Sequence, residues 1–270
     1  MPNFFAHYLH GQKVLETLPK DISEGITNIK LYEIGLQGPD IFYPYRALAF
    51  PNTYKINKIG RKIHKNTGRK FMEKLFEHTV LASSGDLFSY VCGFICHYSL
   101  DSVCHPYINE VARKNDFTHG EIEVEFDRVL LALDDKAPLL TKFSDMITVP
   151  SLKNKAIKEM AKAYKGYKKV TPKVLSRTLQ DFKFFKKLFY SPSEIKQHVL
   201  LYVCRLFMLD KVYDACVMRT HTNPKSFITN TGLIFLFNDC IADSIDLIQN
   251  FADKIKSDTA LSPKFNRRFV

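Results

Sequence analysis

The chain has 270 residues, of which 46% are hydrophobic and 13% aromatic, and it carries a formal net charge of +11. This composition excludes an intrinsically disordered chain, and the length suffices to bury one large core or two small ones. Only 11 residues are glycine and 12 are proline, which favours helices over turn-rich architectures. The excess of 39 Lys and Arg over 28 Asp and Glu predicts attraction to phosphate, either of nucleic acid or of anionic lipid.

The first half of the chain predicts a series of helices. Apolar residues at helical spacing indicate a first helix over residues 2–18, which Pro19 ends. A second apolar segment over 26–45 contains a Gly-Pro-Asp turn and an aromatic cluster. Further helices are expected over 58–82, 85–104 and 118–133, followed by a break at 134–138. Pro106 directly follows His105, so we expect the helix over 85–104 to end there.

The second half is richer in lysine and also helical in pattern. Residues 151–170 place apolar side chains on one helical stripe and lysines on the opposite one: Lys155, Lys158, Lys162, Lys165 and Lys169. This stripe is either an ordinary solvated face or a docking surface for an anionic bilayer or nucleic acid. Two more helices are expected over 198–217 and 232–255. Neither a repeat nor a flexible linker divides the chain, so we predict one all-α domain.

No segment of the chain reads as a secretory signal or a membrane span. The first residues, MPNFFAHYLHG, lack both a basic start and a continuous apolar stretch. The most apolar segments, HVLLYVCRLFMLD and GLIFLFNDC, are too short and too interrupted to cross a bilayer. We therefore expect a cytoplasmic protein whose contact with membranes, if any, is peripheral.

Histidines and carboxylates form two pairs at helical spacing. Asp101 follows His97 at i+4, and Glu123 follows His119 at i+4. Side chains at this spacing are neighbours on one helix face, so each pair could hold one metal ion. Imidazole and carboxylate without thiolate suit zinc and, less selectively, other first-row metals. The alternative is a hydrogen-bonded polar pair at the edge of the core. His105 lies between the two pairs and, with its helix ending at Pro106, should point to a neighbouring ion.

Two other groups of residues are open to an ordinary and a functional interpretation. The aromatic cluster IFYPYRALAF over 41–50 is either core packing or the lining of a lipid or choline pocket. The six cysteines lie in apolar patterns without a C-x-x-C pair. We therefore expect reduced, buried thiols rather than a disulfide framework or a thiolate zinc site.

Five motifs in order along the chain resemble the zinc-dependent phospholipases C, which are related to single-strand-specific zinc nucleases. They are HYLHG (7–11), GPD (38–40), GRKIH (60–64), HYSLDSVCH (97–105) and HGEIE (119–123). The resemblance implies an all-helical, phospholipase C-like bundle with a buried cluster of two or three zinc ions. It assigns one ion to Asp40, His64, His97 and Asp101. A second would share Asp101 and bind His7, and a third would bind His105, His119 and Glu123.

The same resemblance assigns a role to Asp40 and raises a question about the start of the chain. Asp40 is implied as the base that orients or deprotonates the attacking water. In the secreted enzymes the processed N-terminal amine binds a zinc ion, whereas here His7 lies only six residues from Met1. Removal of Met1 would expose the amine of Pro2, and we hypothesise that Pro2 replaces the usual terminal ligand.

These observations predict a zinc-dependent phosphodiesterase that hydrolyses a glycerophospholipid as a phospholipase C does. A single-strand nuclease and a non-catalytic zinc-binding helical protein remain the alternatives. An HD-type phosphohydrolase is disfavoured, because the chain contains no adjacent His-Asp dipeptide. We expect residues 1–140 to form the metal-binding region and residues 141–270 to add helices to the same domain. Peripheral contact with an anionic membrane would involve the lysine stripe, and nucleic acid is the second possible partner.

Overall fold

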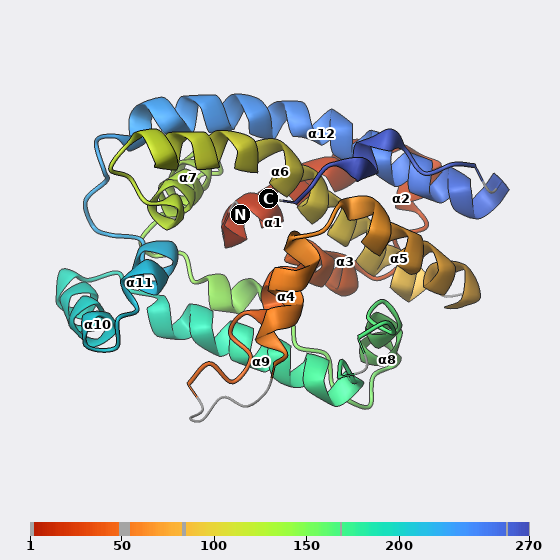
Figure 1. Ribbon diagram of the computed structural model, residues 1–270, viewed down its shortest axis with the longest axis horizontal. Helices are drawn as coiled ribbons and strands as arrows, with labels where there is room; N and C mark the ends of the chain where they lie inside the picture. Colours follow the sequence, from red (N-terminus) through yellow and green to blue (C-terminus); the bar gives the residue numbers. More distant parts are fainter. Residues whose placement is uncertain (1–2, 49–54, 83–84, 168, 258, 270) are drawn as a thin grey trace.

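A computed structural model describes residues 3–48, 55–82, 85–167, 169–257 and 259–269, and these residues form helices with no β-strand among them (Figure 1). The predicted all-α fold is therefore confirmed. In chain order, with η marking 3₁₀ helices, the elements are α1 (Phe4–Thr17), α2 (Lys20–Ser23), α3 (Ile29–Gly35), η1 (Gly38–Phe42), α4 (Asn57–His64), α5 (Gly68–Ala82), α6 (Gly85–Lys114), α7 (His119–Leu133), η2 (Phe143–Met146), α8 (Lys155–Lys162), α9 (Pro172–Phe189), α10 (Glu194–Leu206), α11 (Asp210–Cys216), α12 (Ser226–Ser257) and η3 (Pro263–Asn266).

Helix α6 is the central element, and the rest of the chain packs around it. Its residues are buried on almost every side between Leu87 and Ile108, as expected for a helix that is apolar all round. Helices α1, α3, α8 and α12 contact it, and Figure 1 shows α12 running alongside it. The main hydrophobic core contains side chains from Phe4 to Phe269, so the helices of the second half pack on the same core as those of the first.

Helices α3 and α6 approach each other closely because glycines meet at their contact. A Cβ atom on Gly93 would lie 2.1 Å from the carbonyl oxygen of Tyr32, and one on Gly35 would lie 2.3 Å from that of Tyr90. No side chain fits at either position without moving the two backbones apart. This contact sets the distance between α3, which leads into η1 and Asp40, and α6, which carries His97.

Replacing Gly93 by alanine should lower the free energy of unfolding by about 1–3 kcal/mol, because the extra methyl group overfills the contact between α3 and α6. Urea denaturation measures this change. The matched control is Gly166→Ala, where the added Cβ would lie 3.4 Å from the flexible Lys74 Nζ. If Gly93→Ala is as stable as the control, the close packing of these helices does not limit stability.

The predicted end of a helix at Pro106 is wrong. Helix α6 continues through Pro106 to Lys114. A proline inside a helix removes one hydrogen bond and costs about 3 kcal/mol. Packing of the following turn opposes this cost, because Ile108 is fully buried in a second core cluster with Phe117 and Leu130. Tertiary contacts thus override the local signal, and they carry α6 past Asn109, which contacts His119.

Other helix boundaries also differ from the predictions. The helix expected over 58–82 is two helices, because Thr67 leaves the helical path and forms an isolated bridge with Arg268. The helix expected over 198–217 is likewise divided, with Met208 at a positive φ of 53° between α10 and α11. The lysine-rich helix is shorter than the pattern suggests, since α8 ends at Lys162.

The C-terminal segment returns to α6 and is anchored there, which the sequence did not indicate. The Tyr98 hydroxyl on α6 donates to the carbonyl oxygens of Lys264 at 2.8 Å and Arg267 at 3.0 Å. Phe269 is fully buried, with its ring centroid 4.8 Å from that of Tyr98 and 5.4 Å from that of His64. The last residues of the chain therefore form one wall beside the predicted site residues.

The cysteines and the aromatic cluster are mainly part of the core. All six cysteines are free, five are buried, and Cys216 is partly buried. Ile41, Phe42 and Tyr45 belong to the main core, whereas Ala49 and Phe50 of the cluster lie outside the described residues. Across the described part of the chain, no helix combines the length and hydropathy that a membrane crossing requires.

Candidate metal centre

Three groups of histidine and carboxylate side chains lie where α1, η1, α4, α6 and α7 meet. In each group the possible ligand atoms lie within 4.8 Å of one another. The groups are His7–His97–Asp101, Asp40–His64–His97 and His105–His119–Glu123. Together they contain all eight residues predicted as metal ligands, and His97 belongs to two of the groups. The fold thus brings together side chains from five separate elements.

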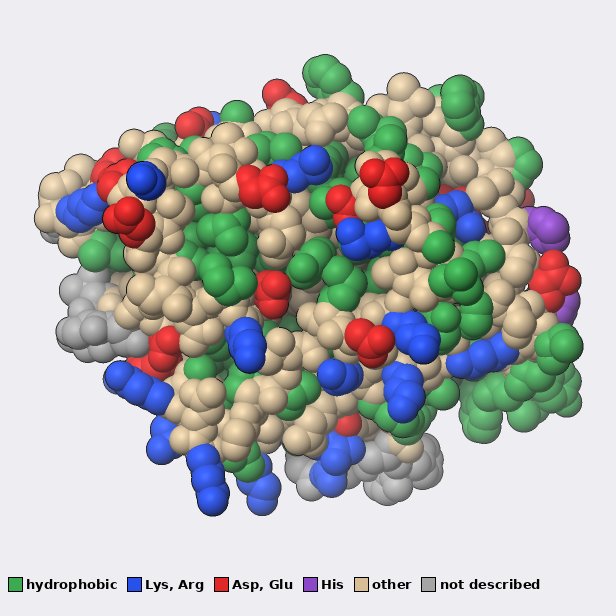
Figure 2. Space-filling view, turned by 180° about the vertical axis from the view of Figure 1, so that it is seen from behind, with side chains coloured by type: hydrophobic (Ala, Val, Ile, Leu, Met, Phe, Trp, Pro, Cys, Tyr) green, Lys and Arg blue, Asp and Glu red, His purple; other side chains and the backbone are tan. Residues whose placement is uncertain are grey.

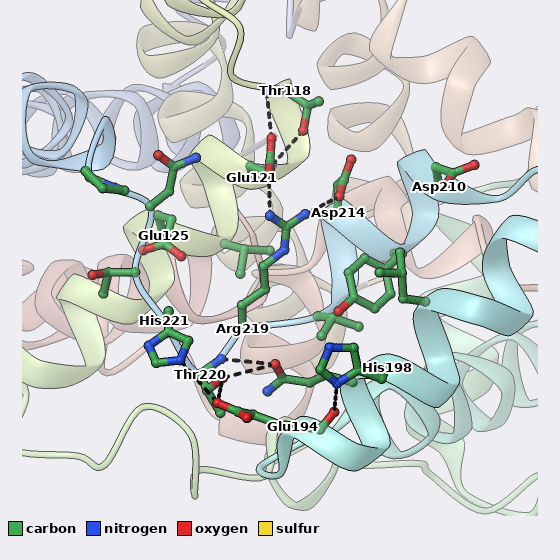
Figure 3. A pocket seen from close by; sticks show the side chains of 18 of the residues that line it. Thr118, Glu121, Glu125, Glu194, His198, Asp210, Asp214, Arg219, Thr220 and His221 are labelled. Atoms are coloured by element: carbon green, nitrogen blue, oxygen red, sulfur yellow. Dashed lines mark hydrogen bonds and ion pairs between the residues drawn. The ribbon is translucent and has the colours of Figure 1, made fainter.

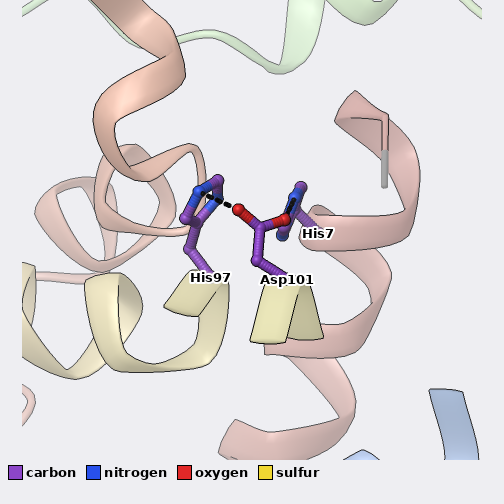
Figure 4. A group of neighbouring side chains, drawn as sticks. All are labelled: His7, His97 and Asp101. Atoms are coloured by element: carbon purple, nitrogen blue, oxygen red, sulfur yellow. Dashed lines mark ion pairs between the residues drawn. The ribbon is translucent and has the colours of Figure 1, made fainter. Parts of the chain in front are cut away.

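Asp101 lies at the centre of these groups and faces four imidazoles. Its Oδ1 atom is 3.3 Å from His7 Nε2 and 4.0 Å from His105 Nδ1. Its Oδ2 atom is 3.1 Å from His97 Nε2 and 3.5 Å from His64 Nε2. The side chain is fully buried, and Figure 4 shows it between His97 of α6 and His7 of α1. This position allows one carboxylate to contact two neighbouring cations through different oxygens.

Four of the five histidines are oriented by a hydrogen bond at Nδ1. A carbonyl or amide oxygen can only accept, so Nδ1 donates and Nε2 is left as the metal-binding nitrogen. The Nδ1 contacts are His64 to the Gly60 oxygen (2.8 Å), His97 to the Leu36 oxygen (3.2 Å), His105 to the Phe269 oxygen (2.6 Å) and His119 to Asn109 Oδ1 (3.1 Å). Such contacts are typical of histidines that bind metal ions.

Eight buried polar atoms of the groups have no hydrogen-bond partner within the described ranges. Buried polar groups in proteins are normally hydrogen-bonded, so a cluster of such atoms requires an explanation. The atoms are both ring nitrogens of His7, Asp40 Oδ1, His64 Nε2, His97 Nε2, both Oδ atoms of Asp101 and His105 Nε2. Imidazole nitrogen and carboxylate oxygen without thiolate form a donor set that zinc accepts. The residues present therefore fit a zinc site.

The electrostatics of the groups follow from burial and from the central carboxylate. Burial lowers the pKa of His7 and also lowers the pKa of His105, to about 4. Burial acts the same way on His64, but Asp101 and Asp40 outweigh it and raise the pKa of His64 to about 10. Burial alone would raise the pKa of Asp101, yet the surrounding imidazoles hold it well below its usual range. Asp101 is therefore ionised and His7 and His105 are neutral at pH 7, the states in which these groups bind metal ions. His64 is protonated without an ion and would release its proton on binding one.

The third group lies where the capped start of α7 meets α6. Helix α6 provides His105 and, beyond Pro106, the Asn109 that contacts His119. Thr118 forms a capping box with Glu121, so α7 begins at His119 and Glu123 follows one turn later. His119 Nε2 lies 2.7 Å from Glu123 Oε1, and His105 Nε2 lies 4.0 Å from the same oxygen. The side chain of His119 is 35% exposed, so this group reaches the protein surface.

Most of the hydrogen-bond acceptors that orient these histidines could not be found from the sequence. The carbonyl oxygens of Leu36, Gly60 and Phe269 carry no side-chain signal, and Asn109 lies in the part of α6 beyond Pro106. One signal was present in the GPD motif. Gly38 has a positive φ of 47°, and a Cβ there would lie 2.3 Å from His97 Cδ2, so only glycine allows η1 to pass against the imidazole.

A comparison with known families identifies the family of this chain. The family model for zinc-dependent phospholipase C matches residues 6–198. The chain belongs to this family. The matched segment contains all eight side chains of the three groups and ends within α10. The family resemblance seen in the motifs is therefore confirmed, and with it the expectation of a zinc-dependent, all-helical protein. No curated protein and no solved structure matches the chain.

The remaining histidines of this zinc-dependent phospholipase C family member lie outside the three groups. His10 is buried one turn after His7 and contacts Ser244 Oγ at 2.8 Å, and burial lowers its pKa to about 3. His78 is partly exposed, and His198 and His221 are exposed. Pro2, the hypothesised terminal ligand, lies outside the described residues.

A separate hollow of about 970 Å³ lies between α7, α10, α11 and the loop before α12 (Figure 3). Arg219 projects into it and pairs with Glu121 at 2.9 Å and with Asp214 at 2.7 Å. Thr220 donates its backbone N–H to Gln197 of α10 at 3.1 Å. None of the eight candidate ligands lines this hollow. Its polar network instead ties α10 and α11 to the helix that carries His119 and Glu123.

Proposed function

We propose that this protein hydrolyses the phosphodiester bond of a glycerophospholipid at two or three zinc ions held by the groups described above. The observation that carries the proposal is the convergence of oriented, buried imidazole nitrogens on the central carboxylate of Asp101. Membership of the zinc-dependent phospholipase C family supports both the metal and the substrate class.

The proposed ligand sets are those that the family resemblance implies, drawn from the side chains of the three groups. Asp40, His64, His97 and Asp101 would hold one ion, His7 with Asp101 a second, and His105, His119 and Glu123 a third. Zinc, when bound, supplies positive charge that lowers the pKa of water and neutralises the phosphoryl oxygens in the transition state. The task of the chain is to keep the Nε2 atoms in place, which the Nδ1 hydrogen bonds do for His64, His97, His105 and His119.

Asp40 is the proposed base for the attacking water. Its Oδ1 atom lies 3.2 Å from His64 Nε2, so the carboxylate is positioned at the metal group. Unlike Asp101 it is only partly buried, and a carboxylate at the edge of the centre can contact a water that arrives with the substrate. Asp40 would accept the proton of this water as the water oxygen bonds to phosphorus. The bond between phosphorus and the diacylglycerol oxygen would break, and this oxygen would leave with a proton taken from solvent.

Replacing Asp40 by asparagine should lower kcat on phosphatidylcholine by on the order of 10²–10⁴-fold, because the amide cannot accept the proton. Metal analysis should show that at most one zinc ion is lost. The matched control is Asp145→Asn, a carboxylate at the start of another 3₁₀ helix, η2, outside the three groups. Unchanged kcat in the Asp40 variant would remove Asp40 from the mechanism.

Assays of the zinc-loaded protein separate the proposed activity from its alternatives. Hydrolysis of phosphatidylcholine without cleavage of denatured DNA is the expected result. Cleavage of denatured DNA alone would identify a single-strand nuclease, to which the net charge of +11 also corresponds. Bound zinc without turnover of either substrate would identify a non-catalytic zinc-binding protein.

We further propose that the basic surface formed by the lysines of α8 and by Lys165 in the turn after it contacts anionic lipid. The side chains of Lys155, Lys158, Lys162 and Lys165 are exposed, while Ile157 and Met160 on the opposite face are buried in the core. Lys162 pairs with Glu159 at 2.8 Å, so the other three lysines contribute most of the positive charge. Nucleic acid remains the second candidate partner for this surface.

A further inference from the structure

Helix α10 exposes a continuous row of large apolar side chains. The residues recur at intervals of three and four, so they share one face of the helix. On the helix they are Ile195, Val199, Tyr202, Val203 and Leu206, and the row continues in Phe207, Met208 and Leu209. Their exposed fractions reach 80% for Ile195, 71% for Tyr202 and 89% for Met208. A contiguous apolar surface of this kind indicates a binding surface.

The opposite side of α10 attaches the helix to the rest of the protein. Cys204 packs with Phe189 of α9 and Tyr213 of α11 in a small cluster that is separate from the main core. Gln197 Nε2 donates to the carbonyl oxygen of Ser191 at 2.9 Å. The apolar row therefore faces away from the core, because the opposite face of α10 packs against α9 and α11.

Basic side chains border the apolar row. Helical geometry places Lys196 on one flank of the row and His198 and Arg205 on the other. Arg205 is exposed and lies 3.6 Å from Asp210, and Glu194 beyond this flank pairs with His221 at 3.1 Å. Each nearby carboxylate thus has a basic partner.

The edge of the molecule that carries α10 also carries the α8 lysines. Figure 1 shows α8, α9 and α10 following one edge, with α9 between the other two. Figure 2 shows basic side chains gathered at one end of this edge and apolar side chains at the other. The edge as a whole therefore combines an apolar end with a basic end.

We propose that the edge formed by α8, α9 and α10 docks on an anionic phospholipid bilayer, with the α10 row inserted among the acyl chains. An apolar centre flanked by cations matches the layers of such a bilayer, in which acyl chains lie beneath anionic headgroups. The α8 lysines would contact headgroups along the same plane. This inference rests on the proposed function, which requires the protein to reach a phospholipid within a bilayer.

The docking helix is connected to the candidate metal centre through α11. A Cβ on Gly120, next to His119, would lie 2.8 Å from Cα of Ala215 in α11. The carbonyl oxygen of Ala215 accepts a hydrogen bond from Asn3 Nδ2 at 3.2 Å, at the start of the helix that carries His7. Docking through α10 would therefore fix the orientation of α1 and α7, and of the ligands on them, relative to the lipid.

A tryptophan probe tests insertion directly, because the chain contains no tryptophan. Phe207→Trp should show a blue-shifted emission on adding vesicles of phosphatidylcholine and phosphatidylserine. Phe227→Trp is the matched control, because Phe227 is 79% exposed on α12, away from the proposed surface. A shift in the control without one at position 207 would overturn the proposal.

Substitutions separate apolar insertion from charge. Tyr202→Ser with Leu206→Ser should weaken vesicle binding, measured by co-sedimentation, by about tenfold or more. Arg205→Gln should weaken binding to phosphatidylserine vesicles by roughly fivefold and leave binding to pure phosphatidylcholine unchanged. The control pair Phe227→Ser with Phe235→Ser removes equally exposed apolar side chains from α12 and should bind as the original protein does.

Two further measurements complete the test. Hydrolysis of a short-chain phosphatidylcholine below its micelle concentration should be the same in every surface variant. If the original protein does not hydrolyse this monomer but the variants bind vesicles as expected, docking stands and the proposed function fails. If the double variant Tyr202→Ser with Leu206→Ser binds vesicles as the original protein does, the proposal fails. It also fails if this variant changes the sedimentation coefficient of the protein without lipid, and that result would identify the row as an interface between two copies of the chain.

Discussion

An asparagine in place of Asp101 should abolish most of the activity and remove zinc from the protein. The carboxylate contacts His7 through Oδ1 and His97 and His64 through Oδ2, within 3.1–3.5 Å. The amide has the same shape but lacks the negative charge and turns one acceptor into a donor. Loss of about 4 kcal/mol of electrostatic stabilisation corresponds to a kcat lower by on the order of a thousandfold. Metal analysis should show the loss of at least one ion.

A second buried carboxylate provides the control for this substitution. Asp181 is 9% exposed, lies outside the three groups, and accepts a hydrogen bond from the Arg46 backbone at 2.8 Å. Asp181→Asn should change stability without changing zinc content or kcat per folded molecule. Full zinc occupancy and normal kcat in Asp101→Asn would contradict the central role assigned to this residue.

Removal of zinc with a chelator should destabilise the fold, and adding zinc back should restore it. Each ion present at a hundredfold excess over its Kd stabilises the folded state by about 2.7 kcal/mol. For a chain of this size the corresponding change in Tm is roughly 5 °C per ion. Differential scanning calorimetry of the treated and reloaded protein measures it, independently of any catalytic activity.

Two buried histidines on α1 give a matched pair for the same experiment. His7 belongs to a candidate metal group, whereas His10, one turn later, contacts Ser244 outside the groups. His7→Gln should show a smaller increase in Tm on adding zinc, and His10→Gln should show the full increase from a lower starting Tm. Equal increases in both variants would exclude His7 as a ligand.

The candidate ligands on α6 and α7 were accessible from the sequence because their spacing is a local property. His97 and Asp101 are neighbours on any helix, and so are His119 and Glu123. The order of the motifs indicated the family and added His7, Asp40 and His64 to the set. The Gly-Pro-Asp motif contained a further signal, because Gly38 at positive φ lies against the ring of His97.

Pro106 shows where local reasoning fails. A proline after His105 normally ends a helix, yet the burial of Ile108 continues α6 and places Asn109 beside His119. The course of the C-terminal segment is a similar case. Nothing near residues 97–105 indicates that the Phe269 carbonyl will accept the hydrogen bond of His105, since these residues are adjacent only after folding.

The sequence by itself determined the helical class, the family and the residue types of the candidate metal centre. The helical class and the residue types depend on composition, periodicity and short-range spacing, and the family on the resemblance that the ordered motifs carry. None of these changes with the arrangement of the helices. Only the tertiary structure decided which imidazole nitrogen faces the centre and which face of α10 stays exposed. Both depend on contacts between distant segments. Backbone carbonyls far along the chain orient the imidazoles, and packing buries one side of α10 and leaves the other exposed to solvent.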